Sequence, residues 1–130
     1  MEYVKDFDGW NILKKRLDIS NQEIYFYPQE VWWCYVGVNI GSEICGKGEL
    51  FLRPVLVYKR VSDDIFWAIP LTKTLREDAH HVPFYFDYEL HSAIILQMKP
   101  LDKSRLFKKI GNLSNYPYKK IKEKAIAFIR

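Results

Sequence analysis

Between residues 31 and 98 the chain is built from short runs rich in β-branched and aromatic residues, separated by polar or glycine-bearing segments. This pattern is typical of strands and leaves little room for long helices. The runs read VWWCYVGVN, RPVLVYK, IFWAIPL, HVPFYFD and SAIILQM. Five strands at this spacing predict a mainly β fold with peripheral helices, and we expect a small, strongly bent antiparallel barrel.

Helical patterns lie outside these runs. Near the N-terminus, apolar side chains recur about one helical turn apart, and Asp6 or Asp8 can cap the first turn. The apolar positions are Phe7, Trp10, Leu13 and Leu17. The sequence therefore predicts a short amphipathic helix whose apolar stripe lies on the barrel.

Two more helices are predicted after the last run. Residues 101–111 carry Asp102 as a candidate N-cap and Gly111 as a C-terminal stop, with Lys108 and Lys109 in the last turn. Residues 115–130 form the second segment, in which a capping Asn and an early Pro precede one apolar face. These positions are Asn115, Pro117, Ile121, Ala125 and Phe128.

The length of 130 residues favours one domain over 1–130. Within it we expect residues 1–20 to form a helix packed on the barrel and residues 28–130 to form the barrel with its C-terminal helices. No apolar run approaches the ~20 residues that span a bilayer, and the first residues do not resemble a secretory signal. We expect a cytoplasmic protein with no membrane partner.

The chain offers little for metal or redox chemistry. Cys34 and Cys45 fit neither a disulfide framework nor a metal site, so we expect reduced thiols. No cluster of His, Asp and Glu resembles a two-metal nuclease site. We therefore expect no metal and no other cofactor.

Positive charge is concentrated at the C-terminal end. Residues 99–130 carry ten Lys or Arg and two acidic residues, whereas the whole chain has a net charge of only +4. One interpretation is an anionic partner, either nucleic acid or an acidic protein segment. The other is solvated lysines on two surface helices.

Four short blocks follow one another in the sequence. They are Gly41 and Glu43 in a glycine-bearing loop, Arg53-Pro54, Pro70-x-Thr72, and the set Gln97, Asp102, Arg105 and Leu106. In this order and with these gaps, residues 28–129 resemble the PemK/MazF family of toxins. Lys99 departs from the pattern, because the family usually has an arginine there. Lysine keeps the positive charge but lacks the paired donors of a guanidinium.

The resemblance implies an SH3-like barrel of the CcdB/PemK type and the toxin of a type II toxin–antitoxin system. It implies a metal-independent, sequence-selective endoribonuclease of the mRNA interferase type, which cleaves single-stranded RNA by attack of a ribose 2′-hydroxyl. It further implies a homodimer, a cognate antitoxin whose acidic tail blocks the RNA groove, and contact with operator DNA through the antitoxin complex.

Three side chains are candidates for the chemistry. Arg53 offers paired donors to a phosphate that gains negative charge, and we expect its tip to be exposed. Thr72 can hydrogen-bond a phosphate oxygen, and Glu43 can accept a proton. Each also has a structural interpretation. Arg53 would form a surface ion pair, Thr72 would satisfy a turn, and Glu43 would be a solvated loop carboxylate. The RNA-binding candidates are Gly41, Lys47, Gln97 and Lys99.

Histidines and tryptophans add further candidates. His80 and His81 are candidates because histidine as a residue type can exchange protons near neutral pH. Nothing in the family pattern falls on them, and we expect exposed loop residues. Trp32 and Trp33 are adjacent, so in a strand they face opposite sides. One fills the core, and the other is free to stack on a base or to lie in an interface.

Two other functions remain open at this point. The first is a non-enzymatic toxin resembling CcdB, which binds DNA gyrase. The second is an inactive barrel that binds nucleic acid or protein. The presence of both Arg53 and Thr72 favours the ribonuclease.

Overall fold

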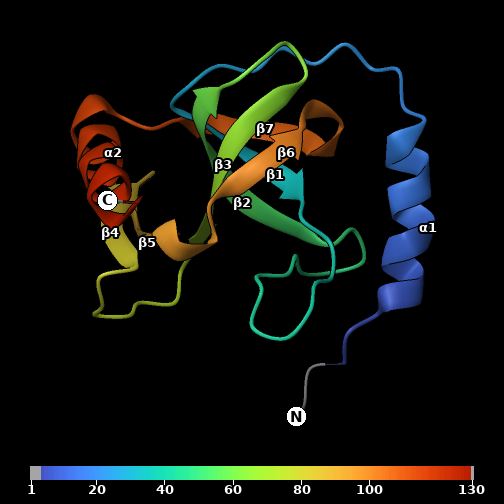
Figure 1. Ribbon diagram of the computed structural model, residues 1–130, viewed down its shortest axis with the longest axis horizontal. Helices are drawn as coiled ribbons and strands as arrows, with labels where there is room; N and C mark the ends of the chain where they lie inside the picture. The colour runs from blue at the N-terminus through green and yellow to red at the C-terminus, as the bar shows by residue number, and fades with distance from the viewer. Residues whose placement is uncertain (1–3, 130) are drawn as a thin grey trace.

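The computed structural model describes residues 4–129, which form seven strands and two α-helices (Figure 1). In chain order the elements are α1 (Phe7–Asp18), β1 (Glu30–Tyr35), β2 (Leu52–Arg60), β3 (Ile65–Thr72), β4 (His81–Phe86), β5 (Glu89–Ile94), the 3₁₀ turn η1 (Ile95–Gln97), β6 (Lys99–Asp102), the 3₁₀ turn η2 (Lys103–Arg105), β7 (Leu106–Asn112) and α2 (Asn115–Ile129).

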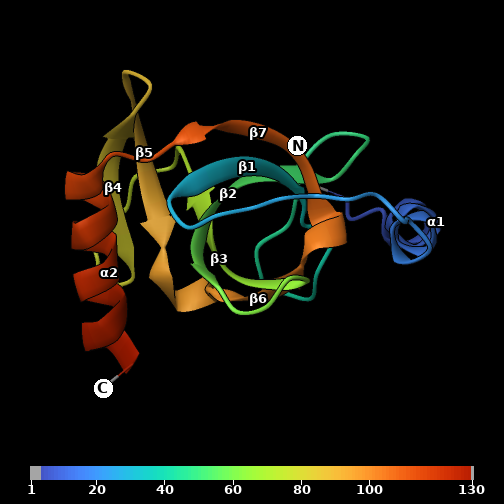
Figure 2. The same ribbon diagram turned by 90° about the horizontal axis from the view of Figure 1, so that it is seen from above.

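All strand pairs are antiparallel, and the strands follow the order β4-β5-β3-β2-β1-β7, with β6 paired to β3 beside this path. The sheet curves strongly (Figure 2). The prediction of a mainly β fold with a helix near each end is confirmed. The expected barrel is not closed, because over residues 4–129 the path ends at β4 on one side and at β7 on the other.

The hairpin of β4 and β5 is held by α2 and does not close the sheet. Ile121 and Ala125 of α2 are buried against Val82 and Phe84 of β4. Their burial confirms the predicted C-terminal helix, since the apolar face of α2 gains its stability from this contact. Phe128, at the end of that face, is 38% exposed.

Helix α1 is confirmed at the predicted place. The Gly9 N–H donates to Asp6 Oδ1 over 2.9 Å, which makes Asp6 the N-cap. Trp10 is the residue of α1 that is buried, whereas Leu13 and Leu17 are half-buried. The helix therefore packs on the sheet mainly through one indole.

The helix predicted for residues 101–111 is wrong. Asp102 does cap a turn, since its Oδ2 accepts the Ser104 N–H over 2.9 Å, but only the 3₁₀ turn η2 follows. From Leu106 the chain becomes β7 and pairs with β1. This pairing satisfies backbone groups along one edge of β1, and it outweighs the local helix signals.

Glu30 is a buried carboxylate that ties β1 to β7. It is 7% exposed, and it accepts hydrogen bonds from the Tyr27 N–H (2.8 Å) and Trp32 Nε1 (3.0 Å), with Lys109 Nζ at 2.9 Å. Burial alone would raise the pKa of Glu30, but the bonds from Lys109, Trp32 and Tyr27 outweigh it and lower this pKa.

We predict that Glu30→Gln lowers the free energy of unfolding by about 2 kcal/mol at pH 7, because it leaves Lys109 unpaired and weakens two hydrogen bonds. Since the folded-state pKa is lowered, this stabilisation is present above the ordinary pKa of a glutamate and is lost as the pH falls through the folded-state value. Urea denaturation between pH 7 and 3 measures both effects, with the exposed Glu49→Gln as control. Identical pH profiles for wild type and Glu30→Gln would contradict the assignment.

Candidate active site

A pocket of about 830 Å³ opens on the sheet beside the ends of β2 and β3. Antiparallel register builds part of its wall, since Trp33 of β1 lies opposite Pro54 of β2 and Lys108 of β7. The lining residues are Trp33, Lys47, Gly48, Leu52, Arg53, Pro54, Leu71, Thr72, Lys73, Thr74, Phe107 and Lys108. Two of the three catalytic candidates, Arg53 and Thr72, therefore meet in one pocket.

Arg53 is held by backbone carbonyl groups. Its Nε donates to the Cys45 oxygen over 2.7 Å, and its Nη1 donates to the Leu71 oxygen over 3.2 Å. Only 9% of the residue is exposed, so the expectation of an exposed tip is wrong. The reason is that the side chain lies between the glycine-bearing loop and the end of β3 and spans the two. These bonds fix the orientation of the guanidinium before any ligand arrives.

Thr72 is the last residue of β3, and it lies one residue beyond the carbonyl that Arg53 contacts. Its Oγ1 accepts the Thr74 N–H over 3.1 Å, so the structural interpretation, a hydroxyl that satisfies a turn, is present. The same bond orients the hydroxyl, whose own hydrogen then serves as a donor. The turn therefore positions Thr72 without consuming its donor.

The lining of the pocket is positive and partly aromatic. Lys47, Lys73 and Lys108 accompany Arg53, and the lining residues given above include no Asp or Glu. Trp33 is 39% exposed and Phe107 is 47% exposed. Cations beside exposed rings suit an anionic ligand that also carries planar groups.

Apart from Lys47, the other predicted site residues lie outside this pocket, around the glycine-bearing loop of residues 39–50, which we call the glycine loop. Gln97 Nε2 donates to the Ser42 oxygen over 3.1 Å, and the Ile44 N–H donates to Gln97 Oε1. Glu43 Oε1 accepts the Ile40 N–H over 3.0 Å. The loop is thus fastened by hydrogen bonds at several points.

Lys99 belongs to this second group. Burial lowers the pKa of Lys99, and Arg105 lowers it further, whereas Glu43 and the two cysteines oppose the shift. Gly41 has a left-handed backbone with φ +57, and the open space around it leaves room for a ligand. Glu43, Gly41, Gln97 and Lys99 therefore form a cluster separate from Arg53 and Thr72, and only Lys47 of the RNA-binding candidates lines the pocket.

Comparison with known families decides what kind of protein has this fold and pocket. The sequence model of the PemK-like, MazF-like toxins of type II toxin–antitoxin systems matches residues 27–129. The chain belongs to this toxin family. Residues 4–26, with α1, precede the matched region.

A solved structure supports the same fold. It is described as an endoribonuclease in complex with its cognate antitoxin from Mycobacterial species, and it superposes with a TM-score of 0.61 at 15% sequence identity. The match covers 81% of this chain and 95% of that one. No curated protein sequence matches the chain. At this identity the solved structure shows the toxin fold alone.

Sequence reasoning missed three charged or aromatic residues of the toxin's pocket, which are Lys73, Phe107 and Lys108. Lys108 and Phe107 were assigned to a helix, which hid their place beside Trp33. Lys73 directly follows Thr72, and this position next to a motif residue could have predicted its place in the pocket. Trp32 and Trp33 do face opposite sides, as predicted: Trp32 packs against a buried cluster, and Trp33 lines the pocket.

The two histidines were predicted to be exposed loop residues, and the exposure is wrong for both, whereas the loop assignment is wrong only for His81. His81 begins β4, and its Nδ1 lies 2.8 Å from Asp78 Oδ1. The His80 ring packs against Phe128 at 5.2 Å between ring centroids. Both histidines are half-buried and lie outside the pocket lining.

Both cysteines are free thiols. Cys34 is fully buried, and burial raises the pKa of its thiol to about 12. Within residues 4–129 no three His, Cys, Asp or Glu side chains gather as a metal site would require. In the same residues no helix has the length and apolar character needed to cross a membrane.

Proposed function

We propose that this protein is the toxin of a type II toxin–antitoxin pair and that it cleaves single-stranded RNA in the pocket of Arg53 and Thr72. Cleavage is sequence-selective, needs no metal, and acts on mRNA. The observation that carries the proposal is the fixed Arg53 guanidinium beside an oriented Thr72 hydroxyl in a positively charged pocket. Membership of the toxin family and the fold shared with an endoribonuclease support it.

The reaction begins with attack of a ribose 2′-oxygen on the adjacent phosphorus. The bond from phosphorus to the 5′-oxygen breaks, which leaves a 2′,3′-cyclic phosphate and a 5′-hydroxyl. Negative charge builds on the phosphate oxygens in the transition state, where Arg53 donates paired hydrogen bonds and Thr72 donates one more. Because the Arg53 bonds are formed beforehand, little reorganisation accompanies the reaction.

Proton transfer is not the task of Arg53, because arginine stays protonated in proteins. Glu43, the predicted proton acceptor, bonds within its own loop and does not line the pocket. We therefore assign Glu43 to the shape of the glycine loop, and we assign no group of this pocket the role of general base.

RNA binding combines charge and stacking. Lys47, Lys73 and Lys108 contact phosphates, while Trp33 and Phe107 stack on bases. Beyond the pocket, Lys99 and the backbone at Gly41 extend the RNA surface, and Gln97 holds the loop that presents them. The bases that line up with these rings determine the selectivity.

The functional unit we propose is a cytoplasmic homodimer with a cognate antitoxin, and the complex of the two binds operator DNA. Its basic residues attract an acidic, disordered antitoxin tail, which covers the pocket. The dimer is tested by sedimentation velocity at micromolar concentration, where we expect a single dimeric species. A monomer throughout that range would refute it.

The decisive assay for the activity incubates the purified protein with a long unstructured RNA in EDTA and maps each new end. We expect discrete cuts that leave 5′-hydroxyl ends. Cleavage that appears only when a divalent metal is added would refute the metal-independent mechanism. If the RNA stays intact with a folded protein, the gyrase-binding toxin or an inactive binding fold becomes the better account.

A substitution at Thr72 tests the second donor. We predict that Thr72→Val slows single-turnover RNA cleavage about thirtyfold, because one hydrogen bond to the transition state is lost. Thr72→Ser keeps the hydroxyl and should stay within about threefold of wild type. Equal losses in both variants would show that the hydroxyl does not act in the reaction.

A further inference from the structure

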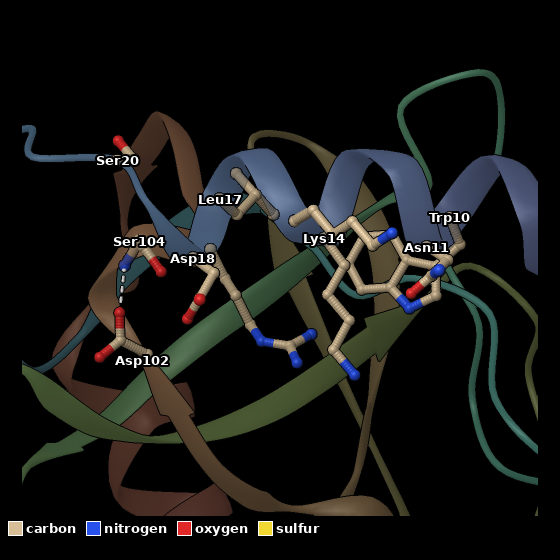
Figure 3. Close-up of a pocket in the computed structure, with 10 residues that line it drawn as sticks. Trp10, Asn11, Lys14, Leu17, Asp18, Ser20, Asp102 and Ser104 are labelled. Atoms are coloured by element: carbon tan, nitrogen blue, oxygen red, sulfur yellow. Dashed lines mark hydrogen bonds between the residues drawn. The ribbon is translucent and has the colours of Figure 1, made fainter.

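The segment that precedes the family match lies against the glycine loop. Lys5, just before α1, contacts the backbone of the loop, and Trp10, within α1, packs on Gly37 and Phe51, which flank the loop. Figure 3 shows Trp10 on the side of α1 that faces the strands, at one end of a cleft between this helix and η2. This contact joins a part of the chain outside the matched region to the part that holds Arg53.

Trp10 fills a slot that the matched region provides. The residue is 7% exposed, and its ring meets the Phe51 ring edge-on at 5.7 Å between centroids. Gly37 has φ +84, and a Cβ there would lie 2.1 Å from the indole, so the indole occupies space that any side chain at this position would need. On another side, the Arg105 guanidinium lies 5.6 Å from the ring centroid.

Lys5 fastens the loop directly. Its Nζ donates to the Asn39 oxygen over 2.7 Å and to the Gly41 oxygen over 3.0 Å. Two carbonyl groups of the loop backbone thus share one cation. The contact orders the start of the glycine loop, where Glu43 and Gly41 lie.

The far side of the glycine loop contacts the guanidinium of Arg53. Cys45 packs against the cluster of Trp10, Val38 and Phe51, and its carbonyl oxygen accepts the Arg53 Nε bond of 2.7 Å. The Gly46 N–H, one residue on, donates to the Gly37 oxygen over 2.7 Å beneath the indole. A shift of the indole would therefore move the carbonyl that orients Arg53.

We propose that Trp10 and Lys5 are positioning residues of the active site, which hold residues 37–51 so that the Cys45 carbonyl orients Arg53. The effect on catalysis rests on the proposed ribonuclease function. The effect on the loop does not, because it can be measured without RNA.

The experiment uses the full chain and follows two signals. The first is the rate at which a thiol reagent labels Cys45; Cys34 is fully buried, so one labelled thiol reports the loop and two report global unfolding. The second is kcat and KM for RNA cleavage. The variants are Trp10→Ala, Trp10→Phe and Lys5→Met, with Ile12→Ala as the control, since Ile12 lies on α1 and is 58% exposed.

For Trp10→Ala we expect labelling of Cys45 about tenfold faster, through local opening of the loop. We expect kcat to fall about tenfold with KM nearly unchanged, because a misplaced Arg53 affects the transition state more than binding. Lys5→Met should accelerate labelling about threefold, whereas Trp10→Phe and Ile12→Ala should stay within about twofold of wild type.

Unchanged labelling in Trp10→Ala and Lys5→Met would overturn the proposal, as would faster labelling with an unchanged kcat. Should Trp10→Ala fail to fold, Lys5→Met tests the proposal by the same criteria. A wild-type protein that leaves RNA intact would refute the proposed function, and the labelling rates would still decide whether Trp10 and Lys5 hold the loop.

Discussion

Arg53→Ala should reduce single-turnover RNA cleavage by about a thousandfold or more, the largest effect expected for any side chain of the pocket. The substitution removes the paired donors that face the phosphate. It also removes the bonds to the Cys45 and Leu71 oxygens that join the loop to β3. Rapid quench with excess protein measures the rate of the chemical step.

A control arginine on the same strand separates the loss of the Arg53 donors from the loss of a positive charge on β2. Arg60 lies at the other end of β2, where it pairs with the exposed Asp63 over 2.8 Å, and Arg60→Ala should cleave RNA at nearly the wild-type rate. Arg53→Lys keeps the charge without the fork and should recover only part of the activity. Cleavage by folded Arg53→Ala within tenfold of wild type would remove Arg53 from the mechanism.

Gly46→Ala should cost about 3 kcal/mol of unfolding free energy, because an added Cβ overpacks the backbone. That Cβ would lie 1.7 Å from the Phe51 carbonyl oxygen. The same oxygen accepts the N–H groups of Val36 (3.1 Å) and Gly37 (3.2 Å), so it cannot retreat without breaking them. Urea denaturation followed by tryptophan fluorescence measures the loss.

Gly48→Ala is the control in the same loop. Gly48 has φ +75 and open space around it, so only backbone strain of about 1 kcal/mol is expected. If the two alanine variants were equally stable, the close approach of Gly46 to Phe51 would not exist in solution.

Local patterns were sufficient for most elements. The strand at residues 65–72 and the helices at both ends carry their own periodicity, and each was predicted close to its observed bounds. Residues 101–111 failed because their caps and lysines are local signals, whereas β7 is stabilised by pairing with a strand some seventy residues earlier. Whether the sheet closes depends likewise on where the β4–β5 hairpin packs, which no local pattern contains.

The site was predictable in composition but not in geometry. The juxtaposition of Arg53 and Thr72 followed from the family resemblance, and neither spacing nor charge indicates it. The carbonyl contacts of Arg53 depend on how the glycine loop folds back over β2, so its burial could not be foreseen. The family resemblance also grouped Glu43 and Gln97 with Arg53, although the fold places them around the loop.

The most direct test of the account uses an RNA that carries a single 2′-deoxynucleotide on the 5′ side of a mapped cut. We predict that this substitution abolishes cleavage at that bond, because the 2′-hydroxyl is the attacking group. The same substitution two nucleotides away should leave the rate of cleavage at that bond unchanged. Cleavage at an unchanged rate beside the 2′-deoxynucleotide would contradict the mechanism proposed for Arg53 and Thr72.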